Sequence, residues 1–216
     1  MVYPGDGPEQ LQLLKLFQVK GVTKALVRAE GVKAITDPQA FRTAGAKFKN
    51  LDFTSSQPAL RADGETITLG EWNLLRAYAS DFGSTSGGVD RARQDAIRRA
   101  ILRSEATKRG IVVGDAEVDS SINKVRSDLA KALNRSEFDA LLAGLGVTED
   151  EYWRLPWVRH EQMMGVLADK VAATIRAQVP RNPGEDDRAY TERSNGYYHQ
   201  WLEDHVRGAR LEQLMP

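Results

Sequence analysis

The stretch from Ala96 to Val171 constrains the fold most, because its apolar spacing predicts four successive helices. The first should end at Gly110, a glycine free to adopt the left-handed conformation, with an apolar residue after it. The second should begin after an N-cap at Gly114 and run to Asn134. Its apolar stripe repeats at intervals of four and three residues and consists of Val118, Ile122, Val125, Leu129 and Leu133.

The third and fourth helices should follow directly. The third is expected to begin at a Ser136 cap and to close at Gly144 and Gly146. It carries the apolar side chains Phe138, Leu141 and Leu142. The fourth opens with a capping box, Thr148 to Glu151, and is expected to reach Arg176.

The fourth helix has more apolar surface than one packing face requires. Its apolar side chains spread over ~200° of the helical wheel, although a stripe of about 100° is enough to bury a surface helix. They are Tyr152, Trp153, Leu155, Trp157, Met163, Met164 and Leu167. The excess either packs against the first 57 residues or the closing helix, with Tyr197, Tyr198 and Trp201, or forms an open cradle for unfolded polypeptides. Pro156 should kink this helix.

Residues 59 to 69 are expected to form a β-hairpin, because the Asp63–Gly64 pair accepts positive φ angles and β-forming residues follow it. Thr68 and Glu71 form a second capping box, which should begin a helix that reaches residue 82. The glycine- and serine-rich residues 83 to 88 predict a linker. They lack the lysine of a phosphate-binding loop, so nucleotide binding is not expected.

The C-terminal part of the sequence predicts more regular structure than the first 57 residues do. The Val179–Gly184 stretch should stop the fourth helix, and a last helix should run from about Asp186 to Arg207. In the first 57 residues we expect a helix over residues 9 to 19, a turn or N-cap at residues 36 to 38 and a polar connection over residues 50 to 58.

Several of these segments resemble the N-terminal chaperone domain of the SurA/PrsA family of extracytoplasmic folding factors, which is related in fold to the client-binding part of trigger factor. The resemblance lies in KRGIVVGDAEVDSSI (108–122), FDALLAGLGVTEDEY (138–152) and the long helix that runs to Lys170. The flanks ADGETITLGEWNLL (62–75) and YYHQWLEDHVRGARLE (197–212) resemble the opening and closing segments of that domain.

The resemblance implies a mostly α-helical domain over residues 58–216, preceded by an extension over residues 1–57. That domain would comprise a helical core (58–177), a short linker (178–187) where other members carry a prolyl isomerase domain, and a closing helix and strand (188–216). The resemblance implies that a short strand near residues 209 to 211 pairs with the hairpin over residues 59 to 69. Its expected function is ATP-independent binding of unfolded or partly folded polypeptides, outside the cytoplasm, without isomerase activity or a cofactor. The expected client-binding side chains are Trp153, Trp157, Met163, Met164, Leu167, Tyr197 and Trp201. A module that binds one dedicated protein partner through the same helices is the alternative.

Composition limits the other functions. The chain has no cysteine, which excludes disulfides, zinc–thiolate sites and thiol nucleophiles. His199 and His205 should face different sides of one helix, so we expect no metal site, and no nucleophile motif suggests an enzyme. The N-terminus has no basic region followed by an apolar one, so we expect no export signal there, and a cytoplasmic location is the alternative to the cell envelope.

One predicted helix is rich in arginine, which is a pattern typical of nucleic-acid binding. Its basic residues are Arg91, Arg93, Arg98, Arg99, Arg103, Lys108 and Arg109. Acidic residues are interspersed among them, the helix has no aromatic residues for base stacking, and the whole chain balances 30 basic with 30 acidic residues. We therefore expect a solvated helix face and no nucleic-acid partner.

Overall fold

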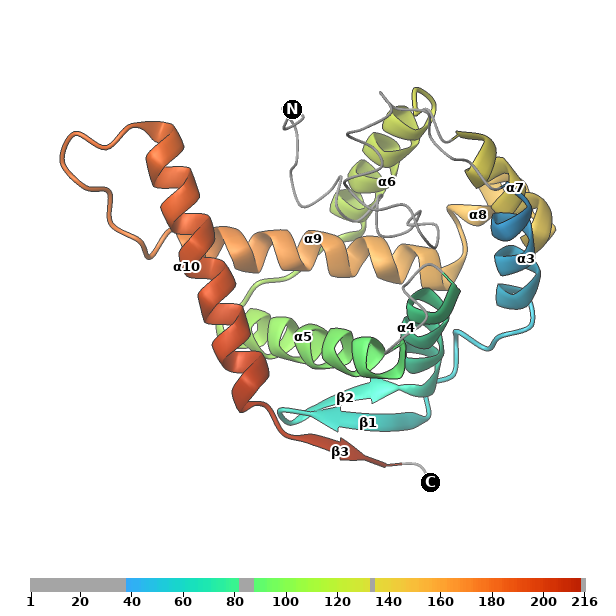
Figure 1. The fold of residues 1–216 in the computed structure, drawn as a ribbon, viewed down its shortest axis with the longest axis horizontal. Helices are drawn as coiled ribbons and strands as arrows, with labels where there is room; N and C mark the ends of the chain where they lie inside the picture. The colour runs from blue at the N-terminus through green and yellow to red at the C-terminus, as the bar shows by residue number, and fades with distance from the viewer. Residues whose placement is uncertain (1–37, 82–87, 133–134, 215–216) are drawn as a thin grey trace.

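The computed structural model describes residues 38–81, 88–132 and 135–214, and there it shows eight helices and one three-stranded antiparallel sheet (Figure 1). The helices are α3 (Pro38–Phe48), α4 (Leu69–Asp81), α5 (Gly88–Lys108), α6 (Asp115–Leu129), α7 (Arg135–Leu145), α8 (Glu149–Tyr152), α9 (Pro156–Arg176) and α10 (Asp187–Gly208). The strands are β1 (Pro58–Ala62), β2 (Glu65–Thr68) and β3 (Leu211–Gln213). The predicted mostly helical fold with a small β element is confirmed.

Some predicted features lie outside the described residues. They are the helix over residues 9 to 19, most of the turn before residue 38, the linker over residues 83 to 87, and the stripe and helix end at residues 133 and 134.

The sheet has the order β2-β1-β3, with both pairs antiparallel. Asp63 and Gly64 adopt φ angles of 50° and 84°, so they form the predicted two-residue turn between β1 and β2. Leu60 lies opposite Ile67, and Ala62 lies opposite Leu211 of β3. The predicted hairpin and its pairing with a terminal strand are therefore confirmed.

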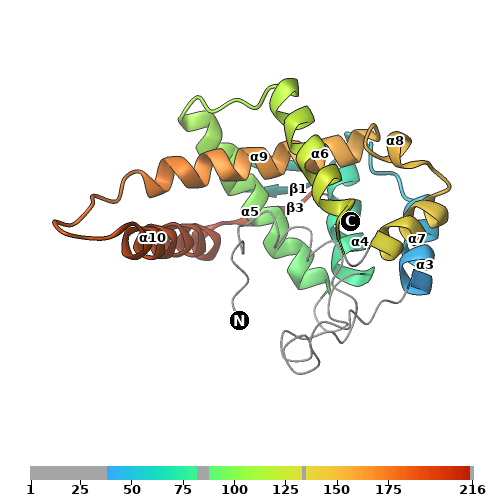
Figure 2. The same cartoon turned by 90° about the horizontal axis from the view of Figure 1, so that it is seen from above.

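One face of the sheet packs against α4 and α5. The alanines Ala92, Ala96 and Ala100, one turn apart on α5, are fully buried in a cluster with Ile67 of β2. Because alanine has only a methyl group, this face lets α5 lie close to the sheet. The opposite side of α5 meets α9, while α4 and α10 contact it as well (Figures 1 and 2).

Helix α3 was not predicted. It packs across α7, where a Cβ atom built on Gly45 would lie 2.3 Å from the Leu141 carbonyl oxygen and one built on Gly144 would lie 2.1 Å from the Arg42 carbonyl oxygen. Glycine is thus required at both positions for this close approach of two helix backbones. Phe41 of α3 is buried in the same hydrophobic cluster as the α7 side chains, so the expected boundary at residue 57 is not a break in packing.

The end of α5 follows its local signal, whereas the end of α6 does not. Gly110 closes α5 with a φ angle of 65°, and the Ile111 N–H donates to the Ala106 carbonyl at 2.8 Å, as predicted. Helix α6 begins after Gly114 but ends at Leu129, five residues before the predicted end. Beyond Leu129, which is the last buried residue of α6, hydrogen bonds of the i to i+3 type turn the chain away.

The predicted cap at Ser136 is also wrong, because α7 already begins at Arg135 and includes Ser136. Gly146, with a φ angle of 74°, follows the end of α7 as predicted, whereas Gly144 lies within the helix at the crossing with α3.

The predicted fourth helix is two helices. Thr148 and Glu151 form the predicted capping box, in which the Glu151 N–H donates to Thr148 Oγ1 and Glu151 accepts from the Thr148 N–H. The chain then leaves the helical conformation at Leu155, and Pro156 occupies the first turn of α9. Proline disfavours the helical conformation of the residue before it, so Pro156 separates α8 from α9 instead of kinking one helix.

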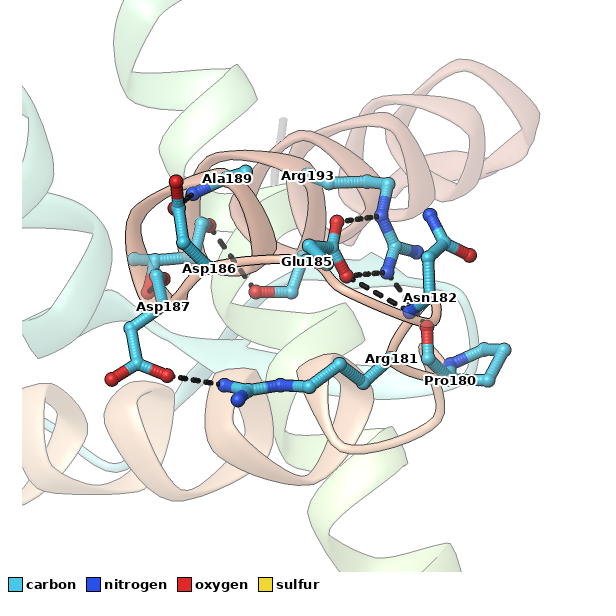
Figure 3. Close-up of polar contacts among 10 residues, drawn as sticks. Pro180, Arg181, Asn182, Glu185, Asp186, Asp187, Ala189 and Arg193 are labelled. Atoms are coloured by element: carbon cyan, nitrogen blue, oxygen red, sulfur yellow. Dashed lines mark hydrogen bonds and ion pairs between the residues drawn. The ribbon is translucent and has the colours of Figure 1, made fainter.

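A short loop joins α9 to α10 (Figure 3). Arg193 on α10 donates to both carboxylate oxygens of Glu185 at 2.8 and 2.7 Å, and Glu185 also accepts from the Asn182 N–H. Asp186 caps α10 by accepting from the Ala189 N–H at 2.7 Å. The predicted start and end of this last helix are confirmed to within one residue.

Candidate functional site

A partly open pocket of about 220 Å³ lies between α4, α5 and α9. Its apolar lining consists of Leu75, Ala79, Leu102, Met164, Gly165 and Ala168. Its polar lining consists of Tyr78, Arg91, Asp95, Arg98, Arg99, Glu161 and Gln162. Gly165 has no side chain and Ala168 only a methyl group, so these two positions of α9 leave room in the lining where α9 meets α5.

An ion-pair network of one buried and three partly buried side chains supports one wall of the pocket. Arg99 donates to both carboxylate oxygens of Glu161 at 2.6 Å and lies 3.5 Å from Glu71 Oε1. Arg103 donates to Glu71 Oε2 at 2.9 Å and to the Thr66 carbonyl at 3.1 Å. The network therefore links α4, α5, α9 and strand β2, and it fixes the helices that form the pocket.

The protonation of Glu71 follows from this network. Its side chain is only 4% exposed, and burial alone would raise its pKa, but His160, Arg103 and Arg99 together lower the pKa to about 2. His160 Nε2 lies 4.0 Å from Glu71 Oε1, which is beyond hydrogen-bond length, so the two arginines are the close partners of this carboxylate. Glu71 is consequently ionised at neutral pH.

Burial and neighbouring charges shift the pKa of two groups that line the pocket, Tyr78 and Arg99. Burial, and next the charge of Glu161, raise the pKa of Tyr78 well above its usual value, so this phenol stays neutral. Burial opposes the charge of Arg99, but Glu161 and Glu71 more than compensate and raise the pKa of this guanidinium. Within the described ranges, no three His, Asp or Glu side chains are grouped so that they could hold a metal ion.

Two of the expected client-binding residues lie in the core. Trp153 and Trp157 are only 6% and 8% exposed, and they belong to an aromatic cluster. The Trp157 ring centroid lies 5.2 Å from that of Phe53 and 6.4 Å from that of Phe48. Residues within the first 57 therefore cover Trp157, as in the packing alternative predicted from the sequence.

The other five expected residues are divided between several places. Met164 lines the pocket and is 5% exposed. Leu167 and Trp201 lie in a cluster formed where α10 crosses α5 and α9, and Met163 is half-buried beside that cluster. Tyr197 is 45% exposed on α10. Of the seven residues, only Met164 lines the pocket, and the client-binding role of all seven stays a prediction.

The ion-pair network beside the pocket was not predicted from the sequence. Arg99 and Arg103 were expected on a solvated face, but both are partly buried and form ion pairs with Glu161 and Glu71, which corrects that expectation. The available signal was their spacing of four residues, which places both on one face of α5. Their partners, Glu71 and Glu161, are distant in sequence, so local patterns did not identify the pairs.

Comparison with known proteins gives no match, whether to a protein family, to a curated protein or to a solved structure. Among the described helices, none combines the length and the hydrophobicity that spanning a bilayer requires. A function for this chain is therefore proposed from its own residues, from their geometry and from the sequence resemblance described above.

Proposed function

We propose that this protein is an ATP-independent folding factor that binds non-native polypeptides, without covalent chemistry and without prolyl isomerase activity. The observation that carries the proposal is the pocket between α4, α5 and α9. Its volume of about 220 Å³ is below the roughly 300–1,000 Å³ of sites for cofactors and drug-sized ligands. It suits one large apolar side chain of a longer chain that passes over the surface.

The lining supports a binder of varied sequences. Met164 is unbranched and flexible, so it adapts to apolar side chains of different shape. Contacts with Leu75, Leu102 and Ala168 are apolar and non-directional, which makes them tolerant of sequence. The resemblance of residues 58–212 to extracytoplasmic folding factors adds support, and an envelope location follows from that resemblance alone.

The connection between α9 and α10 supports the absence of isomerase activity. It runs only from residue 177 to residue 186, whereas an inserted domain needs about 50 residues. Glu185 and Arg193 close this connection into a defined loop.

The test is suppression of aggregation, measured by light scattering with several unrelated unfolded proteins. The full chain is expected to suppress aggregation of most of them and not to accelerate prolyl isomerisation of a short peptide. Ala168→Phe should fill the pocket and weaken suppression. Ala173→Phe, the same change at an exposed position of α9, should not.

Thermal unfolding of both variants separates a filled pocket from a damaged fold. Undiminished suppression by a folded Ala168→Phe protein would show that the pocket is not the binding site. Suppression of a single client would favour the module with one dedicated partner. Absence of suppression for every client would refute the proposed function.

A further inference from the structure

The charges around the pocket are not balanced. Five charged side chains line it, namely Arg91, Asp95, Arg98, Arg99 and Glu161. Three are positive and two are negative, although the whole chain has equal numbers of basic and acidic residues. The pocket therefore carries a local positive charge on a chain with no net charge.

Pairing within the pocket identifies the residue responsible. Arg98 pairs with Asp95 at 3.2 Å, and Arg99 pairs with Glu161 at 2.6 Å. Among the described residues, no carboxylate forms an ion pair with the remaining cation, Arg91. Arg91 is half-buried on the first turns of α5, beside the apolar lining.

We propose that the pocket binds a large apolar side chain that is followed or preceded by an aspartate or glutamate in a non-native polypeptide, with Arg91 binding the acidic side chain. This inference rests on the function proposed above and specifies which client segments the pocket selects. The apolar side chain enters between Leu102 and Met164, and the acidic neighbour stays at the mouth.

Two physical effects favour this pairing. A guanidinium offers parallel N–H donors whose geometry matches a carboxylate, so Arg91 suits an acidic side chain better than an amide. Apolar neighbours lower the local dielectric, so the attraction exceeds that of a fully exposed ion pair. A basic client residue in the same place would meet the uncompensated charge of Arg91, and the pocket would reject it.

The experiment measures binding of labelled short peptides with blocked ends by fluorescence anisotropy. One peptide carries leucine next to aspartate, and two others carry asparagine or lysine in place of the aspartate. The aspartate peptide should bind about 5- to 10-fold more tightly than the lysine peptide, and high salt should reduce this ratio.

Variants assign the preference to one residue. Arg91→Glu should reverse the order of the aspartate and lysine peptides, and the neutral Arg91→Gln should abolish the preference. Arg93→Glu is the matched control, because it makes the same charge change on the same helix outside the pocket. It should leave the preference unchanged.

The outcomes distinguish this inference from the proposed function. Equal binding of all peptides, or a preference that Arg91→Glu does not alter, would overturn the inference and leave the folding-factor proposal standing. If the unmodified protein neither binds any of these peptides nor suppresses aggregation of any client, this inference and the proposed function are both overturned. A peptide without an acidic side chain but with a free C-terminus that binds as tightly would identify the chain end as the ligand and would also overturn the inference.

Discussion

Substitution of Gly144 by alanine tests the packing of α3 against α7. The added Cβ would lie 2.1 Å from the Arg42 carbonyl oxygen and 3.0 Å from the Ala46 nitrogen. Both are backbone atoms of a helix and cannot rotate away, so the two helices must separate. Overpacking of this kind costs about 3 kcal/mol at the upper end of the usual range. Alanine offsets about 1 kcal/mol through its higher helix propensity. The net loss is therefore about 2 kcal/mol.

The matched control is Gly196→Ala. Gly196 lies within α10, is exposed, and has nothing within 4 Å of an added Cβ. Only the higher helix propensity of alanine applies there, so this variant should raise the free energy of unfolding by up to about 1 kcal/mol. In thermal unfolding, Gly144→Ala should lower the melting temperature by about 4–8 °C, whereas Gly196→Ala should raise it by a few degrees. A stabilised Gly144→Ala variant would refute the close approach of α3 and α7.

Two further variants test the core and the ion-pair network. Ile122→Asp places an unpaired charge at a buried position of α6 and should unfold the domain, whereas Val112→Asp, at an exposed position, should be tolerated in circular dichroism melts. The pKa of Glu71 is about 2 in the folded protein against an ordinary 4.5, so its ionisation contributes about 3 kcal/mol to the free energy of unfolding. This contribution is present above pH ~4.5 and is lost as the pH falls towards 2. Glu71→Gln should flatten the acid dependence of the unfolding free energy over that range, and Glu192→Gln, at an exposed ion pair, should not.

Features set by neighbouring residues could be predicted from the sequence. The Asp63–Gly64 turn, the Thr148 capping box and the end of α5 at Gly110 each depend on a few adjacent residues. The closing strand and its pairing were also predicted, but two residues too early in the chain, and from the family resemblance and not from its own short sequence. Helix α3 was missed although Phe41, Ala44, Gly45 and Phe48 are spaced as on one helix face.

Features set by distant residues could not be predicted. Gly45 and Gly144 allow the α3–α7 crossing only as a pair, and neither position alone signals a close approach. The pocket depends in the same way on three helices, and Arg99 finds Glu161 at a separation of 62 residues. Local signals in the sequence predicted the three helices around the pocket. Which faces of these helices meet is decided by tertiary packing.

Truncation of the chain tests whether α3 is part of the folded core. A chain that begins at residue 58 loses Phe41, Phe48 and Phe53, of which the first two are fully buried and the last two contact Trp157. Loss of a buried phenylalanine side chain costs about 3–5 kcal/mol, so the combined loss approaches the roughly 5–15 kcal/mol by which domains are stable. This chain should therefore bind more hydrophobic dye and unfold at a much lower temperature. A chain that begins at Pro38 keeps the ring contacts of Phe48 and Phe53 with Trp157, so it should bind less dye and unfold at a higher temperature than the chain that begins at residue 58. Equal dye binding and equal melting temperatures for the chains that begin at residues 38 and 58 would show that α3 does not stabilise the α7 and Trp157 surfaces against which it lies.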